Sequence, residues 1–201
     1  MTLRVYGDSA SGNCLKVKWI CDLLSVPYLW EEVDVLSGFT RTPAFLALNP
    51  AGQVPVVELP DGRTLAQSNA IVEWLAEGSR LIPADPFERA GMRAWMYWEQ
   101  YSHEPYIAVR RFHLHYLRKR PEELDPKLFE RGSAALERME AALAGGPYLV
   151  GGAFSLADAV LLAYTRMAGQ GGFHLGLYPN LRGWIARVER DLNLEPLAEA
   201  A

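Results

Sequence analysis

Residues 49–74 decide the fold, and they read NPAGQVPVVELPDGRTLAQSNAIVEW. The apolar run at residues 56–59 predicts a short strand, and the Pro-Asp-Gly-Arg sequence after it predicts a turn. A second short strand is expected over residues 64–66, where it gives way to a helix. The stretch therefore predicts a hairpin that leads directly into a helix.

Pro55 stands immediately before the first of these strands. Because proline has no backbone N–H, it fits a strand only at its first residue or at an edge. The backbone of the neighbouring Val54 is then able to pair with a peptide-like ligand as an added strand. An ordinary trans bond is the first expectation from the proline alone, and a cis bond, which would turn the Val54 backbone outward, is the alternative.

Gln67 and Ser68 stand at the head of the helix that follows. Ser68 is expected to be its N-cap, because Ile71, Trp74 and Leu75 form an apolar face at the i, i+3, i+4 spacing of a helix. The N-terminus of a helix offers free N–H groups and the positive end of a dipole, so it binds carboxylates. Ser68 can cap the helix, bind a carboxylate, or do both.

These motifs resemble the glutathione-binding domain of the cytosolic glutathione transferases. The resemblance rests on Asn-Pro-x-Gly-x-Val-Pro, followed by Gln-Ser at the head of a helix that ends in Trp-Leu. It implies a cis bond between Val54 and Pro55, with the Val54 backbone paired to the cysteinyl unit of glutathione. It also implies that Gln67 and Ser68 hold the γ-glutamyl carboxylate, and Gln53 is counted among the expected glutathione-binding residues.

Composition narrows the class of protein. The chain has 201 residues, 50% of them apolar, which is enough for one large domain or two small ones. The formal net charge is −4 without a basic block, so no nucleic-acid partner is expected. No apolar run approaches the roughly 18 residues of a membrane span, and strand-like residues begin almost at once, so neither a membrane segment nor a signal peptide is expected.

Cys14 and Cys21 are the only cysteines in the sequence. They lie two turns apart on one face of a predicted helix, about 10 Å from each other, which is too far for a disulfide. We therefore expect a reduced, cytoplasmic protein.

The order of predicted elements in the first part is strand, helix, strand, helix, strand, strand, helix. The first strand covers residues 3–6, the second covers residues 28–35, and Pro43 starts a short helix. This order predicts a mixed sheet with a βαβ start and a closing hairpin, which is the thioredoxin-like fold.

The second part is predicted to be entirely helical. The first helix is expected to begin at residue 87 and to be kinked at Pro105. Further helices are expected from Asp125-Pro126, over residues 156–167 and from Pro179. Ser155 and Asp158 have the spacing of a capping box before the apolar helix at residues 156–167. We expect a thioredoxin-like glutathione-binding domain at residues 1–78, a linker at residues 79–86 and an all-α domain at residues 87–201. The second part also resembles the cytosolic glutathione transferases.

The loop after the first strand is expected to carry the chemistry. A free cysteine thiol has a pKa of about 8.5, so little of it is ionised at neutral pH. A transferase of this kind must therefore stabilise the thiolate of glutathione with a hydrogen-bond donor or a helix N-terminus. Ser9, Ser11, Asn13 and Cys14 are the candidate side chains.

The resemblance selects Ser11 and Asn13 among them. Ser11 falls where serine-type members of the family keep their activating hydroxyl. The motif also resembles the Thr-Pro-Asn…Lys-Val pattern of the nu-class and yeast prion-related branch, because Ser11-Gly12-Asn13 is followed by Lys16-Val17. Helix capping is the alternative role for Ser11 and Asn13, Cys14 is interpreted as a helix-start residue, and Ser9 is a reserve candidate for either role.

Three further residues are weaker candidates. Arg41 either pairs with the glycyl carboxylate of glutathione or faces solvent. Trp98 and Tyr101 lie on an aromatic stripe and are candidates for binding the electrophile, although such a stripe also suits a core or a dimer surface. The four histidines form no metal set, and no metal is expected.

The sequence therefore predicts a glutathione transferase that uses glutathione as co-substrate and presents its thiolate to a hydrophobic electrophile, as in detoxification. The resemblance, rather than composition, implies a homodimer. Two alternatives stay open at this point. One is a glutathione-dependent disulfide-bond reductase, suggested by Ser11-Gly12-Asn13, and the other is a non-catalytic binding module of the same fold.

Overall fold

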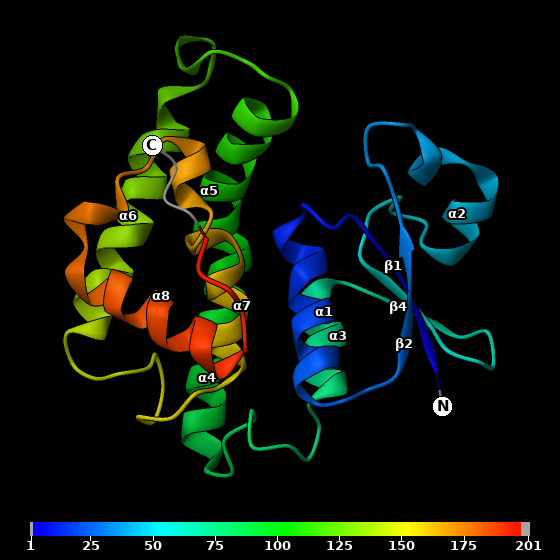
Figure 1. The fold of residues 1–201 in the computed structure, drawn as a ribbon, viewed down its shortest axis with the longest axis horizontal. Coiled ribbons are helices and arrows are strands. Elements are labelled where there is room, and N and C mark those ends of the chain that lie inside the picture. The colour runs from blue at the N-terminus through cyan, green and yellow to red at the C-terminus, as the bar shows by residue number, and fades with distance from the viewer. Residues whose placement is uncertain (1, 198–201) are drawn as a thin grey trace. The chain divides into compact units, whose positions relative to one another are not determined.

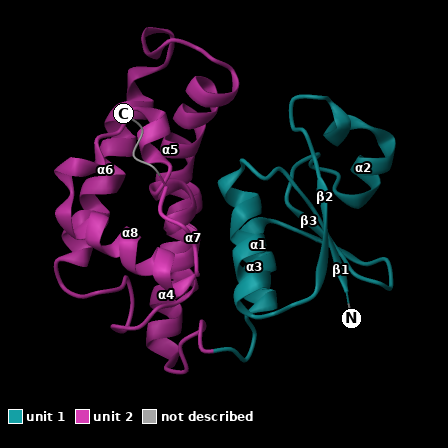
Figure 2. Cartoon of the chain, in the orientation of Figure 1, with its two compact units in different colours: residues 1–79 teal, residues 80–201 magenta. Residues whose placement is uncertain are grey.

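A computed structural model of the chain describes residues 2–197. It divides into two compact units, residues 1–79 and residues 80–201, which are coloured separately in Figure 2. The first unit is an α/β fold and the second is helical (Figure 1).

Over residues 2–79 the first unit contains four strands and three α-helices in the predicted order. They are β1 (Leu3–Gly7), α1 (Gly12–Leu23), β2 (Tyr28–Glu32), the 3₁₀ turn η1 (Phe39–Arg41), α2 (Pro43–Leu48), β3 (Val56–Glu58), β4 (Thr64–Ala66) and α3 (Ser68–Leu75). The strand order is β2-β1-β3-β4; β1 runs parallel to β2, whereas the β1–β3 and β3–β4 pairs are antiparallel. The thioredoxin-like prediction is confirmed.

Helices cover both faces of this sheet. The helices α1 and α3 pack against each other on one face, and α2 lies on the other (Figure 1). Phe45 of α2 packs with Val33 and Val56 to form the core on the α2 side. This sandwich fixes the start of α1 and the start of α3, which both carry predicted site residues.

Two local predictions in this unit are wrong. The second strand ends at Glu32 rather than at residue 35, because the chain turns away from the sheet once Val33 N–H has bonded to the Gly7 carbonyl. Ser68 is the first residue of α3 rather than its N-cap. Gln67 occupies the cap position with a φ of 70°, because the chain must turn sharply between the end of β4 and the start of α3.

Over residues 80–197 the second unit contains five α-helices and short connecting turns. They are α4 (Pro86–Trp98), the π-helical turn η2 (Glu99–His103), α5 (Glu104–Arg111), the π-helical turn η3 (Phe112–Tyr116), the 3₁₀ turn η4 (Pro121–Glu123), α6 (Pro126–Leu143), α7 (Leu156–Thr165), the 3₁₀ turns η5 (Ala168–Gly171) and η6 (Leu175–Leu177), and α8 (Pro179–Asp191). The predicted kink at Pro105 takes the form of the π-helical turn η2 immediately before it, since proline cannot donate to the regular ladder.

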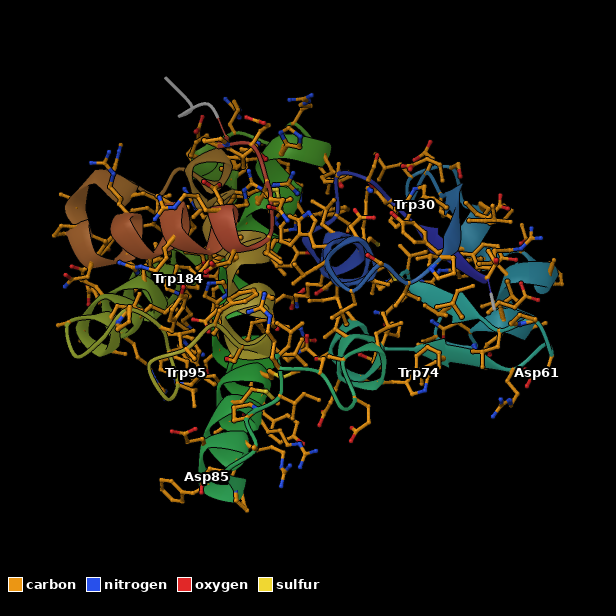
Figure 3. The ribbon with its side chains drawn as sticks, turned by 60° about the horizontal axis from the view of Figure 1, so that its bottom comes forward. Trp30, Asp61, Trp74, Asp85, Trp95 and Trp184 are labelled. Atoms are coloured by element: carbon orange, nitrogen blue, oxygen red, sulfur yellow. The ribbon has the colours of Figure 1, made fainter. Side chains whose placement is uncertain are left out.

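The centre of the second unit is α7, all of whose residues are buried. Its capping box is present as predicted: Asp158 accepts hydrogen bonds from Ser155 N at 3.0 Å and Ser155 Oγ at 3.1 Å. Trp184 of α8 (Figure 3) is fully buried, and its Nε1 donates to the other oxygen of Asp158 at 2.8 Å. One carboxylate therefore joins the start of α7 to α8.

No helix within residues 2–197 is both long and apolar enough to cross a membrane.

Candidate glutathione site

The loop between β1 and α1 is held by its own backbone and by β2. Asp8 accepts hydrogen bonds from Ala10 N at 2.8 Å through its side chain and from Ser11 N at 3.0 Å through its carbonyl. Ser9 donates from both its backbone N, at 2.9 Å, and its hydroxyl, at 3.0 Å, to Glu32 at the end of β2. The side chain of Ser9, the reserve candidate, thus helps to anchor the loop to β2.

Glu32 is suited to that anchoring at neutral pH. Burial alone would raise the pKa of its carboxyl, but hydrogen bonds from Ser9 and from the Trp30 indole outweigh burial and lower the pKa below its ordinary value. The carboxylate is therefore charged and accepts these bonds in the physiological range.

Ser11 stands at the N-cap of α1, and its backbone is extended, with φ −83° and ψ 123°. Its side chain also interacts with the thiol of Cys14, one turn into the helix. Gly12 and Asn13 follow as the first two helical residues, at the end of the helix where its dipole is positive. The structure thus places Ser11 and Asn13 at the positive end of α1.

Asn13 is the point at which the loop meets α3. Ser68 Oγ donates to Asn13 Oδ1 at 3.2 Å, and Lys16 Nζ donates to the same oxygen at 2.8 Å. Lys16 Nζ also donates to Asn69 Oδ1 at 3.3 Å. The structure therefore brings together Asn13, predicted to activate the thiol, and Ser68, predicted to bind the carboxylate.

Sequence reasoning missed Lys16 and Asn69 as members of this cluster. Lys16 is 1% exposed although it carries an ammonium group, and a lysine is buried in this way only when its charge is satisfied by polar partners. The available signal was the spacing of Asn13 and Lys16, because residues three apart face each other on a helix. Asn69 follows Ser68 directly and offered no comparable signal.

The Val54-Pro55 peptide bond is cis. It follows a turn in which Asn49 Nδ2 donates to the Gln53 carbonyl at 2.7 Å and Ala51 N donates to Asn49 Oδ1 at 3.1 Å. Gln53 itself is exposed, and Val54 is half-buried two residues before the start of β3. The turn thus holds the backbone that, by the family resemblance, is expected to pair with glutathione.

Arg41 lies against the same turn. Its Nη1 donates to the Ala51 carbonyl at 3.2 Å, and a Cβ built on Gly52 would lie 2.5 Å from that nitrogen. Gly52 also has a φ of 61°, so glycine is required here by both space and backbone conformation. The Arg41 side chain is exposed, and it supports the turn whether or not it also meets a carboxylate.

Gln67 is exposed and carries the positive φ noted above, a conformation that costs a non-glycine residue free energy. Strain of this kind is concentrated at binding and catalytic sites, where the surrounding structure holds it. Here the flanking elements β4 and α3 hold it, and Gln67 directly precedes the buried Ser68.

The two electrophile candidates differ in their surroundings within the second unit. Trp98, at the end of α4, is half-buried and packs edge-on against Trp95, with Arg138 stacked 4.6 Å above its ring. Tyr101, in η2, is 84% exposed. The contacts of Trp98 are those of a packing residue of the helical unit, and no contact joins it to Tyr101 among the ring contacts described.

Both cysteines are free and fully buried. Burial is the main cause that raises the pKa of Cys14 to about 12, against the opposing effect of hydrogen bonds with Asp8 and Ser11. Burial likewise raises the pKa of Cys21 to about 12. Burial and the raised pKa both keep these two thiols from acting as nucleophiles at neutral pH. Among the described residues, no cluster of three or more His, Cys, Asp or Glu side chains is arranged to hold a metal ion.

Comparison with known proteins gives a consistent result over the chain. The family model for the glutathione S-transferase N-terminal domain matches residues 10–77, and the model for the C-terminal domain matches residues 96–191. A curated relative, glutathione S-transferase 3 of Zea mays, is 32% identical over 78% of this chain and 74% of its own length.

Solved structures agree with these matches. A glutathione S-transferase from Pseudomonas fluorescens is 50% identical, covers 93% of this chain and 94% of its own, and superposes with a TM-score of 0.90. A glutathione transferase homolog from Sulfitobacter, solved with bound glutathione, is 25% identical over 94% of this chain and 92% of its own, with a TM-score of 0.79.

Proposed function

Because the chain belongs to the glutathione S-transferase family, we propose that it binds glutathione in its first unit and activates the thiol for attack on a hydrophobic electrophile. The observation that carries the proposal is the hydrogen bond between Ser68 and Asn13. It joins a segment suited to a carboxylate, at the start of α3, to donors suited to a thiolate, at the start of α1.

In this proposal each part of glutathione has a distinct partner. Gln67, Ser68 and the N-terminus of α3 hold the γ-glutamyl carboxylate through hydrogen bonds and the helix dipole. The backbone of Val54, set by the cis bond to Pro55, pairs with the cysteinyl unit as an added strand.

Activation of the thiol follows from electrostatics. A thiol beside Ser11, Asn13 and the positive end of α1 would lose its proton more readily, because hydrogen-bond donors and the dipole stabilise the anion. The thiolate then attacks an electrophilic carbon, forming a carbon–sulfur bond as the leaving group departs with the electron pair of the broken bond. Trp98 and Tyr101 remain proposed contacts of the electrophile, Arg41 and Gln53 remain proposed glutathione contacts, and a homodimer in the cytoplasm is the proposed working state.

The proposal is tested by calorimetric titration of glutathione into the wild type and Ser68→Ala, with Ser37→Ala in an exposed loop as the matched control. Ser68→Ala removes the hydroxyl that is proposed to turn from Asn13 to the carboxylate when glutathione binds. Loss of this charge-assisted hydrogen bond should weaken binding by about tenfold, while the control binds as the wild type does. Conjugation of an aryl halide should be the preferred reaction over reduction of a model disulfide. Failure of the wild type to bind millimolar glutathione would contradict the proposal, and preferred disulfide reduction would favour a reductase.

A further inference from the structure

The buried ammonium of Lys16 determines which way the amide of Asn13 faces. A lysine ammonium has only donors, so the Asn13 atom that it meets at 2.8 Å must be the carbonyl oxygen Oδ1. Ser68 Oγ lies 3.2 Å from the same oxygen, and Asn69 presents its own oxygen to Lys16 at 3.3 Å. The Lys16 contact therefore sets the orientation of the Asn13 amide, and the Ser68 hydroxyl, which can donate or accept, is compatible with that orientation.

We propose that Lys16 is a positioning residue for thiol activation: it holds Oδ1 of Asn13 inward, so that the amide nitrogen Nδ2 is presented to the sulfur of glutathione. The inference rests on the function proposed above. An amide turned the other way would direct an oxygen with lone pairs at the thiolate, which would oppose ionisation instead of favouring it. Orientation of this one amide thus decides the sign of its effect.

Burial makes the arrangement effective. Lys16 is 1% exposed and Ser68 is 5% exposed, so water competes little for these hydrogen bonds. The Lys16 ammonium, by donating to the carbonyl oxygen of Asn13, also polarises the Asn13 amide. The N–H groups on Nδ2 thereby become stronger hydrogen-bond donors. Because Ser68 shares the same oxygen, the proposed carboxylate subsite and the proposed thiol subsite are linked through Asn13.

The first test measures the pKa of bound glutathione by thiolate ultraviolet absorbance in the wild type and Lys16→Met. Lys18→Met is the matched control, because Lys18 lies two residues further along α1, is partly exposed and bonds to Asp22 and Tyr28 instead. We expect Lys16→Met to raise the pKa of the bound thiol by about one, which is a tenfold fall in its acid dissociation constant, and Lys18→Met to leave it unchanged.

A double-mutant cycle separates positioning from a direct effect of the Lys16 charge. If Lys16 acts through Asn13, Lys16→Met adds no further rise in an Asn13→Ala background. An equal rise in both backgrounds would mean that the charge acts on the sulfur directly, and it would overturn the inference.

Asn13→Asp provides a test that leaves Lys16 in place. The carboxylate keeps the bonds from Lys16 and Ser68, so the fold is retained, but an oxygen replaces Nδ2. The inference predicts a higher bound-thiol pKa in Asn13→Asp than in Asn13→Ala, and a lower one would refute it.

The wild-type measurement distinguishes the two proposals. A low wild-type thiol pKa that Lys16→Met leaves unchanged would refute only the role of Lys16. If the wild type binds no glutathione, both proposals fail.

Discussion

Replacing Asp158 with alanine should strongly destabilise the helical unit. The carboxylate accepts from Trp184 Nε1 at 2.8 Å, from Leu149 N and Ser155 N at 3.0 Å, and from Ser155 Oγ at 3.1 Å. Each buried donor left without an acceptor costs about 1–3 kcal/mol. Burial opposes the charge of Asp158 and raises its pKa, which offsets part of the gain from its hydrogen bonds. We therefore expect a net loss of about 3–5 kcal/mol in the free energy of unfolding.

Urea unfolding followed by circular dichroism measures this loss as a lower midpoint at an unchanged slope. Asp125→Asn is the matched control, because Asp125 caps α6 at an exposed position and asparagine caps as well as aspartate. The control should change stability by a few tenths of a kcal/mol. A loss below about 1 kcal/mol in Asp158→Ala would refute the account of Asp158 as the joint between α7 and α8.

Three further predictions concern packing, reactivity and strain. In Gly132→Ala the new Cβ would lie 2.7 Å from Phe173 Cε1 and closer still to Cζ, so the urea midpoint should fall by the equivalent of about 1–3 kcal/mol; an unchanged midpoint would show that the ring moves freely. Because the pKa of Cys14 and of Cys21 is raised to about 12, only about one thiol in ten thousand is ionised at pH 8, so alkylation of the native protein should be slow and accelerate with rising pH or urea; rapid labelling at neutral pH would contradict their burial. Gln67→Gly should relieve the positive φ and raise stability by about 1 kcal/mol while weakening glutathione binding in the titration, and tighter binding by this variant would argue against a role for the side chain.

Local patterns were enough to predict the elements of both units. Apolar periodicity and turn residues predicted the order of strands and helices around the sheet. The capping-box spacing of Ser155 and Asp158 predicted the start of α7. These features depend on residues close in sequence, so a single sequence carries the signal.

Contacts between distant residues were not predictable in the same way. Ser68 was expected to cap its own helix, but its hydroxyl bonds to Asn13, 55 residues earlier in the chain. That contact exists only because the sheet sets α1 beside α3, and no local rule states it. The same holds for the burial of Lys16, which the sequence analysis used only as part of a motif and did not place in the site.

The most direct test of the account is the pKa of glutathione bound to the wild type, compared with Ser11→Ala and Asn13→Ala. Ser9→Ala is the control, because the Ser9 hydroxyl is already bonded to Glu32. The account predicts a wild-type thiol pKa clearly below the free value of about 8.5 and a rise of about one to two in Asn13→Ala or Ser11→Ala, the loss expected for one hydrogen bond to a charged group. Binding with an unshifted pKa in all four proteins would contradict thiol activation and leave a module that holds glutathione without activating it.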